Sequence, residues 1–554
     1  MRLTIVGIAG KYIHQSLAPW CLKAGLRQYG VKSPCRVLEF NINQPLHQAL
    51  EALMATRPQI AGFSCYIWNI SMVRSLAASL KILSPQTVIV LGGPEAGSRP
   101  KRILKEIPQA DYVISGPGEY AFAELCKRLE AGEDIGAIPG LTFKRPEGVL
   151  SNPPAPMPLA PPDPYTKECL SHINGRIVYV ETSRGCPFRC TFCLSGQEEA
   201  VSFLPLDAAK RRLLKAAASG AKTIKLVDRT FNCHRERAAA LFRFLIRKYQ
   251  ESAFQDVCFH FEVAADLFDD RMLALLKTAP PGLFQMEAGL QSFHEKTLEA
   301  CQRKTDVSRL CRNIAALHSG QNIHLHLDLI SGLPYEDFPA FGESVDKAIA
   351  LRPHMLQLGF LKLLHGSRLR AQCAEFGIEH SDDPPYEILK NKWLSFDELC
   401  RLKRCEEALD RLYNSGKFRR TLELAFAKSG VSPFQLFCRL GGIFAAQPGN
   451  LSLDHCTALT YGFLQTLSGI SAAALRDAMA HDRLATDNTG RLPECLAVKD
   501  EQLGPIIRDL RRQHPEGTKL GICMLYDGGK RVLCADYGRR DPITGEYATK
   551  ILPL

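Results

Sequence analysis

Short apolar runs alternate with polar stretches over the first 150 residues. Five runs rich in branched side chains recur, at residues 2–8, 35–40, 59–64, 87–92 and 112–115. The stretches between them, such as 45–56 and 70–82, have the periodicity of helices. Buried strands that alternate with helices are typical of a parallel sheet covered on both faces. The pattern therefore predicts an α/β domain over residues 1–150 with a doubly wound, Rossmann-like sheet.

A proline-rich stretch ends this first domain. Residues 151–165 contain seven prolines, which exclude a helix or a central strand. We expect residues 151–170 to be a semi-rigid linker.

The same alternation resumes over residues 171–375. Six strand-like runs follow the linker, at residues 177–182, 222–228, 258–264, 283–289, 324–330 and 355–361. Six strand–helix units are too few for a closed eight-unit barrel and fit a partial (β/α)6 barrel. In barrels of this kind the residues just past the carboxyl ends of the strands line the site.

The pattern changes again after residue 375. Ser395 and Glu398 have the spacing of a capping box at the start of a helix with one apolar face. Near the end of the chain two apolar runs flank Asp527-Gly528-Gly529, which predicts a hairpin. Residues 376–554 are therefore expected to form an α+β domain, for which no chemical motif indicates a role.

Composition and charge exclude some classes of protein function. Of the 554 residues, 46% are hydrophobic and 23% are charged, as in ordinary globular proteins, and no apolar run is long enough to span a membrane. The apolar start of the chain is better explained as a buried strand than as a signal peptide, so a cytoplasmic location is expected. The net charge of +11 is mild for this length and does not favour nucleic acid as a partner.

The 20 cysteines point to metal or redox chemistry instead, because a cytosolic chain keeps its thiols reduced. Cys186, Cys190 and Cys193 stand in a C-x3-C-x2-C arrangement directly after the strand at 177–182. Three thiolates on one loop can hold three irons of a 4Fe–4S cluster and leave the fourth iron open for a ligand. A zinc site normally needs a fourth ligand at close spacing, and none follows here. The alternative is that these three cysteines have only a structural role, like the other cysteines of the chain.

This motif, with Phe192 before the last cysteine, resembles that of the radical S-adenosylmethionine (SAM) enzymes. The resemblance implies that SAM chelates the open iron and is cleaved by the reduced cluster to a 5′-deoxyadenosyl radical. It also implies an external electron donor, flavodoxin-like or ferredoxin-like. Phe192 is expected to lie near the adenine. Polar residues at further strand ends are candidate SAM ligands, each of which could equally be structural: Asp228, Glu262, Glu287, Gln291 and Arg303.

Two loops of the first domain follow strand ends, where open α/β sheets bind ligands. One carries Ser64, Tyr66, Trp68 and Asn69, and the other carries Gly92 and Gly93. Together they resemble the cobalamin-binding domain, in which a serine and a Gly-Gly pair enclose the nucleotide tail. The loop that gives that family a histidine ligand to cobalt is missing here, and His14 lies only loosely nearby. We therefore expect cobalamin without a protein imidazole on cobalt, with Tyr66 or Trp68 near its lower face.

The order of the first domain, the linker and the cysteine motif resembles the cobalamin-dependent radical SAM enzymes. The resemblance implies a methyltransferase that acts on an unactivated carbon through methylcobalamin and a 5′-deoxyadenosyl radical. Radical cyclisation or rearrangement without methyl transfer stays open, as does methylthiolation of tRNA or protein. The last alternative is weakened because Cys21, Cys35 and Cys65 are too dispersed for a second cluster. A non-enzymatic cobalamin sensor would have no need of an open-iron cluster. The sequence does not identify the substrate.

Overall fold

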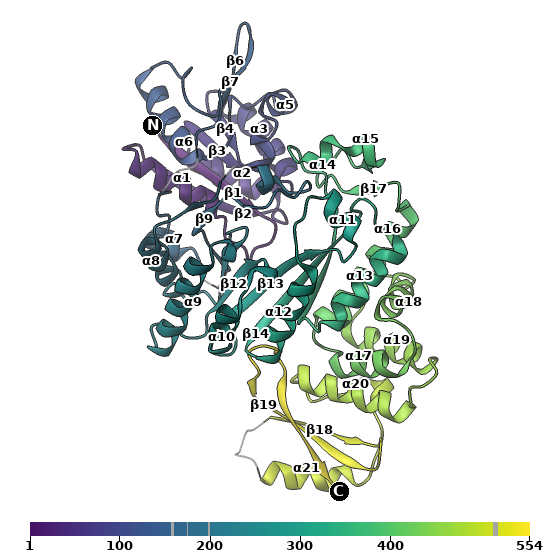
Figure 1. Cartoon of the computed structure of the whole chain (residues 1–554). Helices are drawn as coiled ribbons and strands as arrows, with labels where there is room; N and C mark the ends of the chain where they lie inside the picture. Colours follow the sequence, from purple (N-terminus) through teal and green to yellow (C-terminus); the bar gives the residue numbers. More distant parts are fainter. Residues whose placement is uncertain (157–159, 174, 198–199, 514–518) are drawn as a thin grey trace. The chain divides into compact units, whose positions relative to one another are not determined.

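The computed structural model describes residues 1–156, 160–173, 175–197, 200–513 and 519–554 (Figure 1). These residues fall into two compact units, which are described separately. Unit 1 comprises Met1–Thr278, Cys301–Lys304 and Lys362–Ile388. Unit 2 comprises Ala279–Ala300, Thr305–Leu361 and Leu389–Leu554.

Unit 1 begins with a seven-stranded sheet in the order β2-β1-β3-β4-β5-β6-β7. The first five strands in this order are parallel, as the sequence predicts, and β6 and β7 add an antiparallel hairpin at one edge that the sequence analysis missed. The hairpin strands are short, β6 ends in the exposed Lys144 and Arg145, and no residue of β7 is buried, so no long apolar run marks them. The bounds are β1 Leu3–Ala9, β2 Cys35–Asn41, β3 Ile60–Ser64, β4 Val88–Gly92, β5 Tyr112–Ile114, β6 Leu141–Arg145 and β7 Gly148–Ser151.

Helices cover both faces of this sheet (Figure 1). On β1, Val6 and Ile8 belong to one apolar cluster and Leu3 and Ile5 to the other, because successive side chains point to opposite faces. Burial on both faces explains why the strands have continuous apolar sequences instead of alternating ones. The helices are α1 Leu17–Gln28, α2 Leu46–Ala55, α3 Ile70–Leu83, α4 Pro94–Gly97, α5 Pro100–Glu106 and α6 Gly118–Ala131.

The rest of unit 1 holds three parallel strands, with β11 paired to both β8 and β12. Their bounds are β8 Val178–Val180, β11 Thr223–Leu226 and β12 Cys258–Val263, with helices α7 Lys167–Ser171, α8 Leu206–Ala217, α9 Arg235–Gln250 and α10 Asp270–Lys277. A short antiparallel pair, β9 Ser183–Arg184 and β10 Ser202–Phe203, flanks the cysteine motif. The segment 362–388 adds α14 Arg368–Ala371, α15 Cys373–Phe376 and β16 Glu379–His380.

Unit 2 holds the other three predicted parallel strands, with β14 paired to both β13 and β15. These are β13 Phe284–Gln291, β14 Ile323–Ser331 and β15 Met355–Phe360, with α11 Glu295–Ala300, α12 Val307–Ser319 and α13 Phe338–Ala350. The strands that the sequence predicts for the second domain are thus all present, three in each unit.

The C-terminal part of the chain is α+β, as expected. The capping box between Ser395 and Glu398 starts α16, and the predicted hairpin forms between β18 and β19. The elements are β17 Ile388–Lys390, α16 Phe396–Leu409, α17 Arg419–Lys428, α18 Pro433–Ala445, α19 Leu453–Gln465, α20 Ala472–Thr486, α21 Leu503–Arg512, β18 Leu520–Leu525, β19 Arg531–Arg540 and β20 Tyr547–Pro553.

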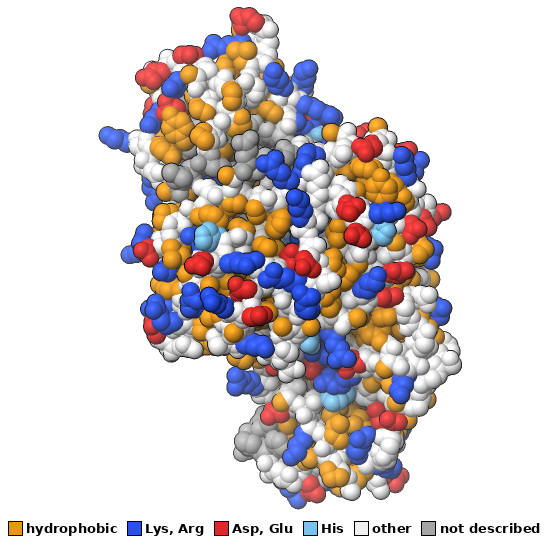
Figure 2. All heavy atoms as spheres, in the orientation of Figure 1, with side chains coloured by type: hydrophobic (Ala, Val, Ile, Leu, Met, Phe, Trp, Pro, Cys, Tyr) orange, Lys and Arg blue, Asp and Glu red, His pale blue; other side chains and the backbone are white. Residues whose placement is uncertain are grey.

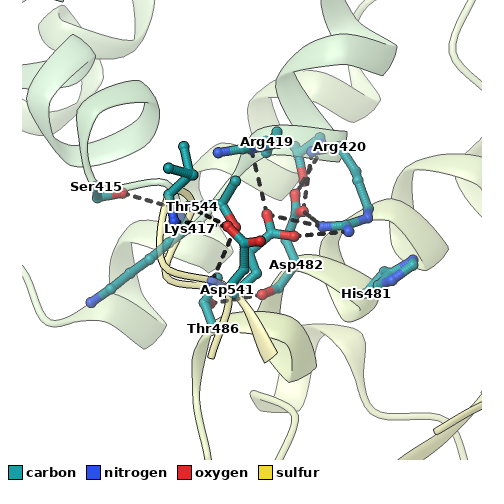
Figure 3. Close-up of polar contacts among 12 residues, drawn as sticks. Ser415, Lys417, Arg419, Arg420, His481, Asp482, Thr486, Asp541 and Thr544 are labelled. Atoms are coloured by element: carbon teal, nitrogen blue, oxygen red, sulfur yellow. Dashed lines mark hydrogen bonds and ion pairs between the residues drawn. The ribbon is translucent and has the colours of Figure 1, made fainter. Parts of the chain in front are cut away.

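A buried carboxylate joins the helices of this part (Figure 3). Asp482 on α20 accepts hydrogen bonds from the backbone N–H groups of Arg420 and Thr421 at the start of α17, at 3.0 and 2.9 Å. Arg420 also pairs with Glu546, next to β20, at 3.0 Å. An anion at a helix N-terminus satisfies donors that have no partner within the helix. This cluster therefore fixes α17 against α20 and the C-terminal sheet.

Among the described residues, no helix has both the length and the apolar character needed to cross a membrane. Lys and Arg side chains are interspersed with Asp and Glu over the face shown in Figure 2. The net positive charge is therefore not gathered into one basic field on that face.

Candidate functional site

A cavity of about 770 Å³ opens at the carboxyl ends of the first strands of unit 1. Its walls come from two parts of unit 1 that are distant in sequence. The first domain contributes Ser64 and the glycines of the β4–α4 turn, and the region after β8 contributes Ser183, Arg184 and Gly185. A volume of this size, lined mainly by apolar groups, is typical of a cofactor or small-molecule site.

The turn after β4 brings the main chain close to the cavity. Gly93 has φ +95, and a Cβ there would lie 2.7 Å from the carbonyl oxygen of Cys65. At Gly92 a Cβ would meet only the carbonyl oxygen of Ile114, at 3.7 Å. Packing alone therefore requires glycine at position 93, whereas Gly92 leaves open room beside the cavity.

The loop after β3 presents an aromatic pair to the cavity. The rings of Tyr66 and Trp68 stack with their centroids 4.4 Å apart and their planes 6° from parallel. Burial raises the pKa of Tyr66 to about 12, so its hydroxyl stays protonated. Trp68 is 48% exposed, and its Nε1 donates to the carbonyl of Ile8 at 3.0 Å. Large exposed aromatic surface beside a cavity marks a place where a ligand could pack.

Of the six residues predicted to bind cobalamin, Asn69 alone does not line the cavity. Its side chain is fully buried, and Nδ2 donates to the carbonyls of Ile8 and Ser64, at 3.0 and 2.9 Å. Its Oδ1 accepts from the backbone N–H of Tyr66 at 2.8 Å. Asn69 thus fixes the shape of the loop that carries Tyr66 and Trp68.

His14 also lines the cavity, where its Nδ1 lies 2.7 Å from the hydroxyl of Tyr179. Burial and nearby cations, Lys11 first among them, lower the pKa of His14. The imidazole is therefore neutral at pH 7 and one of its nitrogens is engaged within the protein.

The cysteine motif forms the loop after β8 and β9. Cys190 is buried, and Cys186 and Cys193 are half-buried. The Cys186 thiol lies 3.4 Å from the hydroxyl of Thr230, and the backbone N–H of Thr191 donates to the carbonyl of Cys301 at 2.9 Å. Gly196 packs so closely on this loop that a Cβ would lie 2.9 Å from the carbonyl oxygen of Cys190. The loop is therefore held in place by its contacts with Thr230, Cys301 and Gly196.

Arg303 lies against this loop. Its Nη1 is 3.7 Å from Cys190 Sγ, and its guanidinium lies over the ring of Phe188 at 5.4 Å. Burial raises the pKa of the Cys190 thiol, and Arg303 opposes that rise. A cation beside a buried thiol favours the thiolate, which is the form that binds iron.

Asp228 is hydrogen-bonded to the residues at the start of the loop. Its carboxylate is buried and accepts from the hydroxyls of Thr182 and Ser183, both at 2.6 Å, and from the backbone N–H of Thr182 at 2.9 Å. Burial raises the pKa of Asp228 to about 6, against these hydrogen bonds. The structure thus engages the carboxylate within the protein, two residues before Thr230.

The remaining predicted SAM residues lie in different units. Phe192, Glu262 and Arg303 belong to unit 1, where Glu262 pairs with Lys225 at 3.7 Å. Glu287 and Gln291 lie on β13 in unit 2. Gln291 has φ +76 at a break in the β13–β14 register, and its Oε1 is buried without a hydrogen-bond partner in the part of the chain that the structure describes. Strain and an unpaired polar atom at a strand end are typical of a functional position.

An ion-pair cluster that the sequence analysis missed joins the two parts of unit 1. Arg184 contacts Glu119 at the start of α6 at 2.5 Å and Glu181 at 2.7 Å. Arg184 strengthens the ionised form of Glu119, so the pKa of that carboxyl is lowered although burial acts to raise it. No short motif contains these residues, because Glu119 and Arg184 meet only through the fold.

Three family models match this chain in order. A B12 binding domain covers residues 3–126, the radical SAM superfamily covers residues 180–348, and a protein of unknown function (DUF4080) covers residues 374–515. The first two contain the cavity loops and the cysteine motif described above. The chain thus contains a B12-binding domain followed by a radical SAM domain.

Proteins similar to this radical SAM chain include several methyltransferases. It is 25% identical to the cobalamin-dependent radical SAM methyltransferase TokK of Streptomyces tokunonensis, over 55% of this chain and 47% of TokK. It is also 25% identical to a 2-(S-pantetheinyl)-carbapenam-3-carboxylate methyltransferase of Streptantibioticus cattleyicolor, over 77% of this chain and 68% of that protein. The chain thus matches less than half of the length of TokK.

Two solved structures share the fold. The cobalamin-dependent SAM radical enzyme OxsB aligns with 93% of this chain and 81% of its own, at a TM-score of 0.61 and 13% identity. The radical SAM methyltransferase TsrM of Kitasatospora setae, solved with cobalamin and a [4Fe-4S] cluster, aligns with 70% of this chain and 79% of its own, at a TM-score of 0.57 and 17% identity. The predicted α/β architecture of a cobalamin-binding domain followed by a radical SAM domain is confirmed.

Proposed function

We propose that this chain is a cobalamin-dependent radical SAM methyltransferase that methylates an unactivated carbon. The observation that carries the proposal is the wall of the 770 Å³ cavity, which runs from Gly92 and Gly93 to Gly185, the residue before Cys186. The cavity suited to cobalamin therefore reaches the residue next to the cysteine loop, although none of the three cysteines lines it. The names of TokK and the carbapenam methyltransferase support the same activity.

The residues present fit both groups. Open space at Gly92, the buried Ser64 and the stacked Tyr66–Trp68 pair suit a large planar cofactor, since glycine allows close approach and aromatic rings pack on flat surfaces. Cys186, Cys190 and Cys193 supply three thiol ligands on one braced loop, with Arg303 favouring the thiolate at Cys190. When bound, cobalamin supplies methyl transfer and the cluster with SAM supplies hydrogen abstraction.

The protein's own contribution is to position these groups and exclude water. Asp228 and Thr230 fix the two ends of the turn that leads to Cys186. Arg184 anchors the same turn to Glu119 of the cobalamin-binding domain. The mostly apolar walls of the cavity limit the access of solvent to reactive species. We expect Phe192, Glu262, Glu287, Gln291 and Arg303 to contact SAM, and Asp228 to shape that site.

The proposed reaction needs an external electron donor of the flavodoxin or ferredoxin type to reduce the cluster. We also propose that the protein works in a reducing compartment such as the cytoplasm. All 20 cysteines are free, which suits such a compartment.

A product analysis tests the proposal. The chain is reconstituted without oxygen, supplied with iron, sulfide, hydroxocobalamin and a strong reductant, and incubated with SAM. A methyltransferase of this kind forms S-adenosylhomocysteine as well as 5′-deoxyadenosine, because it uses SAM both as methyl donor and as radical source. Formation of 5′-deoxyadenosine alone in the presence of cobalamin would favour cyclisation or rearrangement instead. Cyclisation is the alternative to test because the chain is also similar to an anaerobic magnesium-protoporphyrin IX monomethyl ester cyclase of Synechocystis, at 32% identity over 22% of this chain.

A further inference from the structure

A buried polar cluster connects the segment 362–388 to the glycine turn after β4. Tyr386 is 1% exposed, and its hydroxyl donates to Glu95 Oε1 at 2.5 Å. Arg99 Nη2 donates to the same carboxylate oxygen at 2.6 Å and to the Tyr386 hydroxyl at 2.9 Å. All of these residues belong to unit 1.

Glu95 lies two residues after Gly93, in the first turn of α4. Its backbone N–H donates to the carbonyl of Cys65 at 3.2 Å, and the N–H of Cys65 donates to the carbonyl of Gly92 at 2.7 Å. The side chain of Glu95 is 2% exposed. The backbone of Glu95 is therefore hydrogen-bonded to the residues that hold the glycine turn, so a shift of Glu95 would also shift the turn that lines the cavity.

The cluster is built to hold Tyr386 in one place. The Tyr386 ring packs edge-on against His365 at 4.7 Å and lies beneath the guanidinium of Arg370 at 5.2 Å. The carbonyl of Tyr386 accepts from the N–H of Leu363 at 2.9 Å. Burial, followed by the hydrogen bond to Glu95, raises the pKa of Tyr386, so it acts as a donor at neutral pH.

Arginines surround the two carboxylates of the cluster, Glu95 and Glu106. Arg99 Nη1 donates to both oxygens of Glu106 at 2.8 Å, and Arg102 binds Glu106 at 2.6 Å. Burial and the neighbouring arginines lower the pKa of His365 to about 3, so this histidine adds no further positive charge. Glu95 thus has two hydrogen-bond donors on one oxygen, and one of them comes from the far segment.

The segment that supplies Tyr386 overlaps the start of the family of unknown function, which covers residues 374–515. We infer that this segment holds the cobalamin site in its binding conformation. Tyr386 is the positioning residue, and it acts through Glu95 on the Gly92–Gly93 turn. The inference rests on the proposed function and assigns a role to the opening part of the uncharacterised domain. The affinity for cobalamin depends on the Tyr386 hydroxyl, although Tyr386 does not line the cavity.

The test compares Tyr386→Phe with the wild-type chain. Phenylalanine keeps the ring packing and removes only the hydroxyl, which leaves Arg99 as the donor from this cluster to Glu95. We expect the dissociation constant for hydroxocobalamin, measured by equilibrium dialysis, to rise roughly tenfold. The iron bound by the reconstituted chain stays at the wild-type level, because the cysteine loop keeps its contacts.

Tyr413→Phe is the matched control. The Tyr413 hydroxyl donates to the carbonyl of Pro353 in unit 2, away from the glycine turn in sequence and in a different unit. We expect a similar loss of thermal stability and no change in affinity for cobalamin. An equal loss of affinity in both variants would overturn the inference, since it would show general loosening of the chain.

A double-mutant cycle tests the route through Glu95. If Tyr386 acts through that carboxylate, adding Tyr386→Phe to Glu95→Gln weakens cobalamin binding much less than Tyr386→Phe does alone. If the two substitutions instead raise the dissociation constant for cobalamin by factors that simply multiply in the double mutant, Tyr386 does not act through Glu95. Wild-type affinity in Tyr386→Phe, with lowered stability, would show a purely structural residue. A wild-type chain that binds no cobalamin would instead refute the proposed function itself.

Discussion

Arg184 Nη2 lies 2.5 Å from Glu119 Oε1 and joins the turn before Cys186 to the first turn of α6. The side chains are 15% and 7% exposed, so this ion pair is largely withdrawn from water. Glu181 shares the guanidinium at 2.7 Å. One arginine thus pairs with two carboxylates that are largely withdrawn from water and connects the B12-binding domain to the cysteine loop.

Replacing Arg184 should therefore be costly. Arg184→Gln leaves Glu119 buried without its cation, and we expect the free energy of unfolding to fall by about 3 kcal/mol, with less iron bound after reconstitution. Urea titration and iron analysis measure the two effects. Arg411→Gln is the control, because Arg411 pairs with Glu407 in an exposed i,i+4 bridge that is worth under about 0.5 kcal/mol. Equal effects of both substitutions would contradict the role assigned to Arg184.

The three cysteines of the motif should be required together. Cys186→Ala, Cys190→Ala or Cys193→Ala each removes one thiolate, so we expect the iron bound per chain to fall severalfold and SAM cleavage to be lost. Cys311→Ala on α12 removes a half-buried thiol outside the motif and should leave both unchanged. Full iron content in any of the three motif variants would show that the cluster has other ligands.

Gly93→Ala tests the glycine turn. Gly93 has φ +95 and ψ 171, a backbone region that essentially only glycine adopts, so alanine costs about 1–3 kcal/mol there, and the added Cβ would also clash with the carbonyl of Cys65. Gly132→Ala also has a positive-φ cost, of about 1–2 kcal/mol in the left-handed region at φ +70, but no atom lies within 4 Å of the new Cβ. We expect both variants to lose stability and only Gly93→Ala to lose cobalamin binding, measured by thermal unfolding and equilibrium dialysis. Unchanged binding in Gly93→Ala would place cobalamin elsewhere.

Asp482 gives a prediction for pH. Burial raises its pKa from 3.8 to about 6 against its hydrogen bonds to Thr421 and Arg420. Between about pH 4 and 6 the folded chain keeps a proton that the unfolded chain has lost, so stability from this group falls as pH rises through that window. The wild-type curve should thus decline by up to about 3 kcal/mol more than that of Asp482→Asn. Parallel curves in urea titrations at pH 4–7 would contradict this.

The sequence predicted the strands well and placed the cysteine motif on a loop after one of them, because both are local patterns. Runs such as 59–64 are apolar on both faces, and the spacing of Cys186, Cys190 and Cys193 lies within one loop. It missed the β6–β7 hairpin, because β6 has only three buried residues before the exposed Lys144 and Arg145 and β7 has none. It also missed Arg184, Glu119 and Tyr386, since a contact such as that of Tyr386 with Glu95 spans 291 positions and no local pattern encodes it.

Asp228 and Asn69 show a subtler limit. Both follow strand ends, as ligand-binding residues do, yet their side chains are buried and bonded within the protein, Asp228 to Thr182 and Ser183 and Asn69 to the carbonyl of Ile8. Position in sequence locates the edge of a sheet but does not decide whether a polar group faces a ligand or the backbone.

The metal content of the reconstituted chain tests the central claim most directly. After anaerobic reconstitution with iron, sulfide and hydroxocobalamin and removal of unbound reagents, iron and cobalt per chain are measured together. A shared site for both groups predicts about four irons and one cobalt, with cobalt lost in Gly93→Ala and iron lost in Cys190→Ala. Four irons without cobalt in the wild-type chain would contradict the claim, because the first domain would then serve a purpose other than binding cobalamin.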